Sequence, residues 1–201
     1  MDSKEIIQMI AHPEKVWARS EILSKPNPIP MENGMYAWFF KEIPTNVPSV
    51  RCQKYKNMSL LYAGISPKNE TSSQNLRKRI LTHYRGNAEG STLRLTLGVL
   101  LCEESGFELR RVGSGKRKSV RTQESSGWIN DNAFVVWVKY KYPRKIEKDV
   151  LKHFSLPLNI QDNNHHEFSK KLSAFRTKAR RLAEKLPIAN EDNLQRIGGG
   201  K

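Results

Sequence analysis

The chain has 201 residues, and its 35 Lys and Arg outnumber its 20 Asp and Glu to give a formal net charge of +15. This length fits one domain, or one domain with an extension, and the positive charge favours a nucleic acid partner because bound Lys and Arg release counterions from phosphates. The two cysteines have no zinc-binding spacing, no apolar run approaches the ~20 residues of a membrane span, and the N-terminus lacks a signal-peptide layout. We therefore expect a soluble, cytoplasmic protein.

The beginning of the chain predicts helices followed by two strands. Residues 3–24 have the pattern of two helices, of which the second begins at Pro13. The Pro-rich stretch 25–30 ends this pattern. Apolar strands are predicted at 34–40 and 59–65, and because neither alternates strictly between apolar and polar residues, each is expected to be covered on both faces.

The middle of the chain combines helices with a basic segment and one more strand. Helices are predicted at 75–84 and from Ser91 onward, each with an apolar stripe. Residues 109–121 contain six Lys or Arg and no acid, and their Gly and Ser content predicts the tip of a hairpin. A short helix or turn at 125–132 precedes the strand at 133–140, which is rich in β-branched and aromatic residues.

Two further helices are predicted in the last part of the chain. Pro143 opens the first of them. The second spans about 167–186, and its apolar residues, four and three apart in turn, predict one apolar seam with basic residues on the other faces. The seam comprises Phe168, Leu172, Phe175, Ala179, Leu182 and Leu186.

Five short elements able to carry chemistry follow one another along the chain. They are Gly34-Met35-Tyr36, Tyr62-Ala63-Gly64, Arg79 with His83, Glu147 and Asn159. Taken singly, each residue also fits an ordinary structural place, such as a strand tyrosine, a surface cation or a helix end. Their order resembles that of the GIY-YIG nuclease family from about residue 33 to 160, although Met35 and Ala63 stand where the family triplets have isoleucine.

The resemblance implies an α+β fold in which a small three-stranded antiparallel sheet is flanked by helices, with helical N-terminal and C-terminal extensions. The predicted strands at 34–40, 59–65 and 133–140 would supply that sheet. We expect a helical extension at 1–30, a nuclease core at 31–162 with a basic insertion at about 86–131, and a basic amphipathic helix with its tail at 163–201.

Arginine and histidine on one helix suit phosphodiester hydrolysis, which needs an activated water and a sink for negative charge. Arg79 offers a planar, permanently charged fork for phosphate oxygens. It shares a helix face with His83 because the two residues are four apart. Arg77 is a competing candidate for the phosphate, but the Arg-x-x-x-His spacing of the family favours Arg79.

The resemblance also implies roles for the other residues. Glu147 would hold one Mg²⁺ or Mn²⁺ ion per active site, and Mg²⁺ commonly takes only one or two carboxylates. Tyr36 would activate the water or relay its proton, and Tyr62 would position the phosphate or the water. His83 would share the proton relay, and Asn159 would orient groups of the site. Because a tyrosine with a pKa near ~10 is a poor base, Tyr36 needs a cation nearby.

Nucleic-acid contacts are expected at one glycine and at several basic residues. Gly64 would let the backbone approach the substrate where a side chain would block it. The basic residues would follow the phosphate backbone without reading the base sequence. They are Arg77, Arg110, Arg111, Lys116, Arg117, Lys118, Arg121, Lys171, Lys178 and Arg181.

The sequence thus predicts a metal-dependent DNA endonuclease of restriction or defence type, with duplex DNA as the favoured substrate and no membrane partner. Two alternatives stay open: a nucleic-acid-binding module that kept the fold and lost the chemistry, and a nuclease acting on RNA or single-stranded DNA. The oligomeric state, monomer or homodimer, is open as well.

Overall fold

A four-stranded antiparallel sheet lies at the centre of the protein, whose computed structural model describes residues 1–85, 88, 90–102, 109–111, 120–122 and 126–189. In the order β2-β3-β1-β6, its strands are β1 (Gly34–Phe40), β2 (Lys54–Tyr55), β3 (Met58–Ser66) and β6 (Ala133–Lys139). The three predicted strands are β1, β3 and β6. The prediction missed β2, because a strand of two residues leaves no periodic pattern in a sequence.

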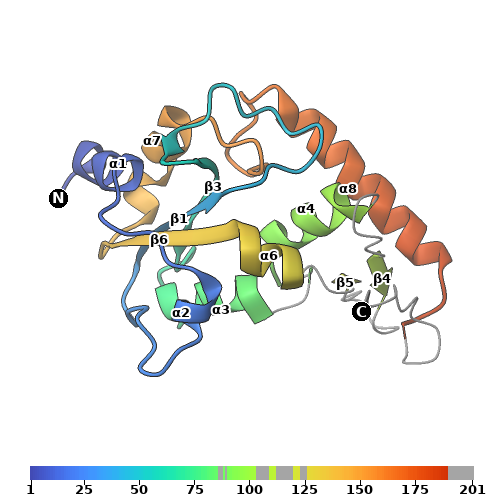
Figure 1. Cartoon of the computed structure of the whole chain (residues 1–201), viewed down its shortest axis with the longest axis horizontal. Helices are drawn as coiled ribbons and strands as arrows, with labels where there is room; N and C mark the ends of the chain where they lie inside the picture. The colour runs from blue at the N-terminus through green and yellow to red at the C-terminus, as the bar shows by residue number, and fades with distance from the viewer. Residues whose placement is uncertain (86–87, 89, 103–108, 112–119, 123–125, 190–201) are drawn as a thin grey trace.

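Helices lie against both faces of this sheet (Figure 1). They are α1 (Ser3–Ala11), α2 (Arg19–Ile22), α3 (Leu76–Arg85), α4 (Thr92–Leu100), α6 (Ser126–Asn132), α7 (Arg144–His153) and α8 (Phe168–Lys185). A separate antiparallel pair, β4 (Leu109–Arg111) and β5 (Val120–Thr122), lies where a hairpin was predicted. Within the described ranges, no helix is long and apolar enough to cross a membrane.

The two faces of the sheet bury separate apolar layers. Along β1, Tyr36, Trp38 and Phe40 belong to one layer and Met35 and Phe39 to the other, as the alternation of side chains along a strand requires. Residues of α3, α4 and α8 complete the first layer, and residues of α1 and α7 complete the second. Every residue of β1 and β3 is buried, so the prediction that both strands are covered on two faces is confirmed.

The segment after α1 is extended where a second helix was predicted. Trp17 exchanges two backbone hydrogen bonds with Val135 of β6, at N···O distances of 2.9 and 3.0 Å, and its ring stacks on Trp137 with a centroid distance of 5.3 Å. The prediction of a helix from Pro13 is therefore wrong, because pairing with the edge of β6 satisfies this backbone instead. Only the short α2 remains helical.

The seam predicted for the last helix holds only over the first part of α8. Phe168 and Leu172 are buried, but Leu182 is 52% exposed and Ala183 is buried in its place. A seam with a period of about 3.5 residues drifts round a helix that has about 3.6 residues per turn. In the last part of α8, the inward face therefore includes a residue outside the predicted seam, Ala183.

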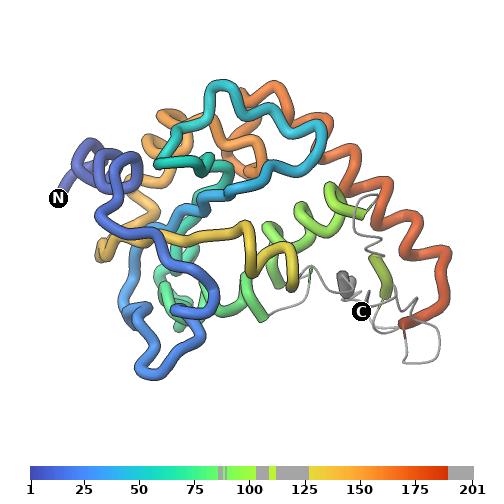
Figure 2. The backbone as a smooth tube through the Cα atoms, viewed as in Figure 1, coloured from blue at the N-terminus to red at the C-terminus, as the bar shows by residue number. Residues whose placement is uncertain are grey.

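α8 packs against α4 and β4, at the end of the molecule opposite α1 (Figure 2). α1 packs against α7 and β6 at the other end. Both predicted extensions therefore contact the parts of the chain that surround the sheet.

Candidate active site

Four of the predicted site residues meet on one face of the sheet. Tyr36 and Tyr62 come from β1 and β3, and Arg79 and His83 come from α3. Nε of Arg79 donates a hydrogen bond to the hydroxyl of Tyr36 at 3.2 Å, and Nε2 of His83 lies 2.9 Å from the same oxygen. The ring of Tyr62 lies beside both, with centroid distances of 6.5 Å to Tyr36 and 5.9 Å to His83. These four residues form the Tyr36 cluster.

The register of the sheet and the pitch of α3 bring this cluster together. Tyr62 pairs with Trp38, two residues after Tyr36, so both tyrosines project from the same face of the sheet. α3 packs on β1 and β3. Arg79 and His83 lie one turn apart on it and both reach the tyrosine. The prediction of a shared helix face is confirmed.

Glycine makes room for the central tyrosine. Gly64 pairs with Tyr36, and a Cβ on Gly64 would lie 2.6 Å from the hydroxyl oxygen of Tyr36 and 2.9 Å from its Cζ. Gly64 was expected to let the backbone approach the substrate, but the ring of Tyr36 occupies the space beside it. Gly34 is confined in a similar way, because a Cβ there would collide with the carbonyl oxygen of Val138.

Burial sets the protonation states of the cluster. Tyr36 is 0% exposed, His83 1% and Tyr62 6%. Burial and the neighbouring Tyr62 raise the pKa of the Tyr36 phenol, against the opposing effect of Arg79. Burial and nearby cations, Arg79 first among them, hold the pKa of the His83 imidazole well below 6.5. At neutral pH the phenol therefore keeps its proton, and His83 is neutral and able to accept one.

Ser91 holds His83 from its other side. Its Oγ lies 2.7 Å from Nδ1 of His83 and, as the N-cap of α4, accepts a hydrogen bond from the backbone N–H of Arg94. When Nδ1 carries the proton it donates to Ser91, and Nε2 then presents its lone pair to the hydroxyl of Tyr36. The sequence predicted only the start of a helix at Ser91, because nothing in it showed that this cap would face His83.

The start of α4 supports the cluster in two further ways. Oγ1 of Thr92 lies 3.1 Å from the hydroxyl of Tyr62. The side chain of Arg94 donates to the carbonyl oxygens of His83 and Tyr84 at 3.3 and 3.1 Å, which ties the end of α3 to α4. α4 lies inside the predicted insertion at 86–131, so part of this insertion positions the residues of the site.

Glu147 lies in the first turn of α7 and is half-buried. Burial raises the pKa of its carboxyl, Lys68 acts against this rise, and Asp162 adds to it. Among the described residues, none donates a hydrogen bond to the Glu147 carboxylate or forms an ion pair with it. A half-buried carboxylate in this setting suits a divalent cation.

A cation at Glu147 would depend on few protein ligands. Over the described ranges, no group of three or more His, Cys, Asp or Glu is placed to hold a metal ion. Mg²⁺ commonly keeps several waters and takes one or two carboxylates, so Glu147 with waters fits this ion. Lys68, whose Nζ donates to Oε1 of Gln161 at 2.9 Å, lies near both Glu147 and His83. No motif or spacing in the sequence pointed to this lysine.

Asn159 uses its amide on the backbone of β3. Its Nδ2 donates to the carbonyl oxygen of Ala63 at 2.8 Å, and its Oδ1 accepts from the N–H of Ala63 at 3.0 Å. The N–H of Leu158 adds a hydrogen bond to the carbonyl oxygen of Leu61 at 3.1 Å. Asn159 therefore orients the backbone between Tyr62 and Gly64, and acts on the cluster through that strand.

Arg77 was the rival of Arg79 for the phosphate. Its Nε donates to the carbonyl oxygen of Ile29 at 2.6 Å, whereas Nε of Arg79 donates to Tyr36. The geometry therefore favours Arg79, in agreement with the Arg-x-x-x-His spacing.

The two arginines of β4 cap the end of α8. Arg110 donates to the carbonyl oxygen of Pro187 through Nε at 3.2 Å and Nη2 at 2.8 Å, and Arg111 donates to that of Leu186 at 3.1 Å. Arg110 is 4% exposed, so it faces the protein although it was expected to contact nucleic acid. Arg121 lies opposite it in β5. The predicted contacts Lys116, Arg117 and Lys118 lie outside the described residues.

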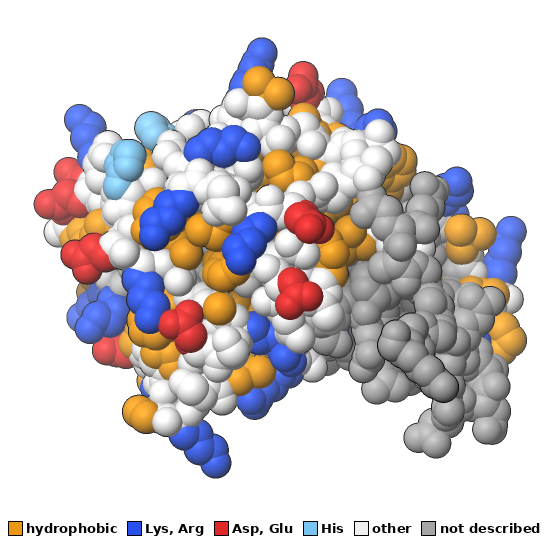
Figure 3. All heavy atoms as spheres, viewed as in Figure 1, with side chains coloured by type: hydrophobic (Ala, Val, Ile, Leu, Met, Phe, Trp, Pro, Cys, Tyr) orange, Lys and Arg blue, Asp and Glu red, His pale blue; other side chains and the backbone are white. Residues whose placement is uncertain are grey.

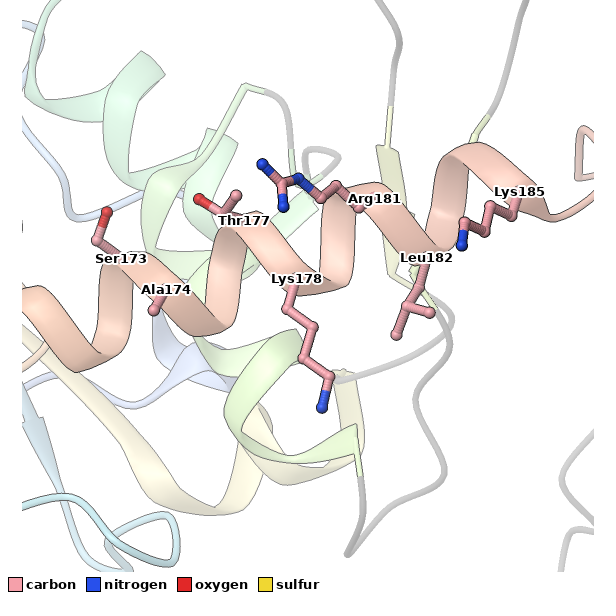
Figure 4. A pocket seen from close by; sticks show the side chains of 7 residues that line it. All are labelled: Ser173, Ala174, Thr177, Lys178, Arg181, Leu182 and Lys185. Carbon is pink, nitrogen blue, oxygen red and sulfur yellow. The ribbon is translucent and has the colours of Figure 1, made fainter.

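The outer face of α8 presents the remaining predicted contacts. Lys171, Lys178 and Arg181 are exposed. Lys178 and Arg181 line a surface hollow of about 390 Å³ together with Leu182 and Lys185, and the described residues around it all come from α8 (Figure 4). On the face of the molecule shown in Figure 3, by contrast, Lys and Arg side chains are interspersed with Asp and Glu.

Comparison with known proteins gives one finding. A family model described as GIY-YIG catalytic domain matches residues 34–178, which begin with β1, end within α8 and include the whole Tyr36 cluster and Glu147. Neither a curated protein nor a solved structure matched the chain.

Proposed function

Because the chain belongs to the GIY-YIG family, whose catalytic-domain model matches it from β1 into α8, we propose that it is a metal-dependent DNA endonuclease. The family indicates a nuclease-type function and therefore a nucleic acid substrate. The observation that best supports the chemistry is the contact of one hydroxyl, on Tyr36, with both Arg79 and His83. Duplex DNA as substrate, Mg²⁺ or Mn²⁺ as cofactor and a restriction- or defence-type role complete the proposal.

The Tyr36 cluster offers a path for the proton of the attacking water. Tyr36 accepts this proton while its own passes to Nε2 of neutral His83, so no free phenolate has to persist. Burial and Arg79 disfavour the imidazolium that forms on His83, so this transfer would depend on the negative charge of the bound phosphate. Nδ1–H of His83 stays bonded to Ser91 during this transfer. Because Tyr36 is fully buried in this state, the water has to enter the cluster when the substrate binds.

Arg79 and Glu147 would take up the negative charge. Nε of Arg79 donates to Tyr36 and Nη1 donates to the carbonyl oxygen of Gly90 at 2.9 Å, and the other N–H groups of this fork can contact phosphate oxygens. A divalent cation held by Glu147 and waters would supply a Lewis acid for the phosphate. Tyr62, held by Thr92, would border the phosphate on the other side of the cluster.

A digestion panel tests this proposal. The protein is incubated with supercoiled plasmid, linear duplex DNA, single-stranded DNA and RNA, each with Mg²⁺, Mn²⁺ or EDTA, and the ends of any products are mapped. We expect nicking or cutting of duplex DNA that EDTA stops. Salt-sensitive binding without cleavage in either metal would contradict the proposal and favour a binding module, and cleavage confined to RNA would contradict the choice of DNA.

Tyr36→Phe provides the matched control for contaminating nucleases. It removes one hydroxyl and keeps the ring that fills the buried site. We expect cleavage to fall by roughly a hundredfold or more, the scale of general acid–base catalysis, with an unchanged circular dichroism spectrum. Equal cleavage by Tyr36→Phe and the parent would show that the activity does not come from this cluster.

A further inference from the structure

α8 carries an arginine on its inward face. Phe168 and Leu172 are buried at 5% and 0% exposure, and Arg176 continues their row at the next step of four residues. Phe175, beside it, packs against the same apolar layer. Arg176 is half-buried accordingly, whereas its neighbour Arg180 is exposed. A cation therefore occupies a position of the helix where an apolar residue would pack.

Arg176 has no polar partner among the residues that the structure describes. Over the part of the chain that the structure describes, no hydrogen bond or ion pair reaches its side chain. Burial lowers the pKa of its guanidinium, and Arg180 lowers it further. A partly desolvated charge that no carboxylate balances is unfavourable in the free protein. Such a residue is expected where an anionic ligand supplies the missing partner.

The inward face of α8 leads to the Tyr36 cluster. Tyr62 belongs to the same apolar layer as Phe168 and Leu172. Its hydroxyl meets Thr92 at the start of α4, against which α8 packs. Arg176 lies near enough to Tyr62 for this neighbour to raise the pKa of the guanidinium, against the larger effect of burial. The cluster therefore has one arginine on α3, Arg79, and a second one that approaches from α8.

From this placement we propose that Arg176 binds a phosphate of the substrate backbone beside Tyr62, so that α8 completes the active site. The guanidinium fork matches the oxygens of a phosphodiester and is always charged. Substrate binding would then supply a counter-charge that none of the described residues provides. This inference rests on the proposed function, and it adds a phosphate-binding residue that neither the Arg-x-x-x-His spacing nor the apolar seam of α8 predicted.

Three variants test the inference. Arg176→Met keeps the length and packing of the side chain without its charge, Arg176→Lys keeps a charge without the fork, and Arg180→Ala removes an exposed arginine from the same helix as a control. Single-turnover cleavage and, in EDTA, equilibrium binding of a short DNA duplex are measured for each. We expect Arg176→Met to cleave roughly a hundredfold more slowly, the scale for losing one donor to a transition-state oxyanion, with Arg176→Lys between it and the parent.

Stability and chemical rescue separate this role from a structural one. Replacing a half-buried cation that has no partner among the described residues by an apolar side chain should leave the melting temperature equal or higher, whereas a structural role predicts that Arg176→Met lowers it. A low, non-denaturing concentration of guanidinium ion should restore part of the cleavage that Arg176→Met loses. It should not increase cleavage by Arg180→Ala. A lower melting temperature with no rescue would overturn the inference.

The two proposals fail in different ways. If the parent cleaves DNA and Arg176→Met cleaves and binds as well as Arg180→Ala does, Arg176 has no such role and the nuclease assignment stands. If the parent binds DNA without cleaving it, and Arg176→Met loses more affinity than Arg180→Ala, the phosphate contact stands and the nuclease assignment fails. A parent that neither cleaves nor binds would overturn both.

Discussion

The hydroxyl of Tyr36 depends on three neighbours. Arg79 donates a hydrogen bond to it, His83 pairs with it, and Gly64 leaves open the space that the phenol fills. Because the cluster is buried and close-packed, one added methyl group or one lost hydroxyl is enough to move these atoms.

Gly64→Ala tests whether the glycine exists to admit Tyr36. The new Cβ would lie 2.6 Å from the tyrosine hydroxyl, so we expect the free energy of unfolding to fall by about 1–3 kcal/mol, as for other overpacked cores, and cleavage to fall with it. Gly127→Ala is the control, because a Cβ there meets nothing within 4 Å. Denaturant unfolding and single-turnover cleavage measure both. Parent-like stability and rate in Gly64→Ala would refute the explanation.

Ser91→Ala tests the orientation of His83. The variant loses the N-cap of α4 and the partner of Nδ1, so we expect a loss of about 1 kcal/mol in stability and a fall in kcat of roughly tenfold. Asp2→Ala, which removes the N-cap of α1, should lower stability alone. An unchanged kcat in Ser91→Ala would show that Ser91 does not hold the imidazole.

The buried imidazole makes stability depend on pH. The pKa of His83 in the folded protein lies well below 6.5, its ordinary value, which applies in the unfolded chain. Between these two pKa values the unfolded chain binds more protons than the folded protein, so stability falls as the pH drops below 6.5. We expect the parent to lose more unfolding free energy than His83→Gln between about pH 7 and about pH 5.5. Glu147, whose pKa is raised, contributes to both proteins and cancels in the difference. Parallel pH profiles would contradict the buried, neutral histidine.

For single helices and strands, sequence patterns predicted the features that depend on the backbone period alone. The i, i+4 spacing of Arg79 and His83 placed both on one face of α3, and the two glycine–tyrosine triplets marked β1 and β3, because the periods of helices and strands are properties of the backbone. The extended segment at Trp17 was missed, because its hydrogen bonds go to β6, more than a hundred residues away. Long-range pairing of this kind overrides a local helical pattern.

The two arginines of β4 show the same limit. Their basic segment predicted contacts with nucleic acid, and only the fold shows that Arg110 and Arg111 meet the carbonyl oxygens at the end of α8. The start of α4 is a further case, because no spacing in the sequence relates Ser91 to His83. Residues that support a site through tertiary contacts carry no periodic signal.

Arg110→Ala and Arg181→Ala separate capping from DNA contact. Losing the hydrogen bonds from Arg110 to Pro187 should lower the free energy of unfolding by about 1–3 kcal/mol. Arg181 is exposed on α8, so its loss should change stability by less than about 0.5 kcal/mol while it weakens duplex binding and reduces the salt slope by roughly 1. Melting curves and binding titrations at several salt concentrations measure both. The reverse pattern would contradict these assignments.

At the scale of the whole molecule, the net charge of +15 predicted a polyanionic partner but not where it binds. The face of the molecule in Figure 3 carries side chains of both charges. On α8, Lys178 and Arg181 are exposed on the outer face, and Arg176 lies half-buried on the inward face. Which cations face outward depends on how α8 packs on α4 and β4. A helix that contacts substrate on its outer face and reaches the Tyr36 cluster on its inner face would link binding to catalysis.

The dependence of single-turnover DNA cleavage on Mg²⁺, for the parent and Glu147→Gln, tests whether Glu147 holds a catalytic metal ion. Glutamine keeps the shape of the side chain but removes the charge that would hold the cation, and because burial already disfavours that charge, the variant should be at least as stable as the parent. We predict a parent rate that saturates with Mg²⁺ and a variant that is slower by roughly a hundredfold or more, since a catalytic metal supplies several kcal/mol. A Glu147→Gln variant that cleaves as fast as the parent at every Mg²⁺ concentration would show that Glu147 does not hold a catalytic cation.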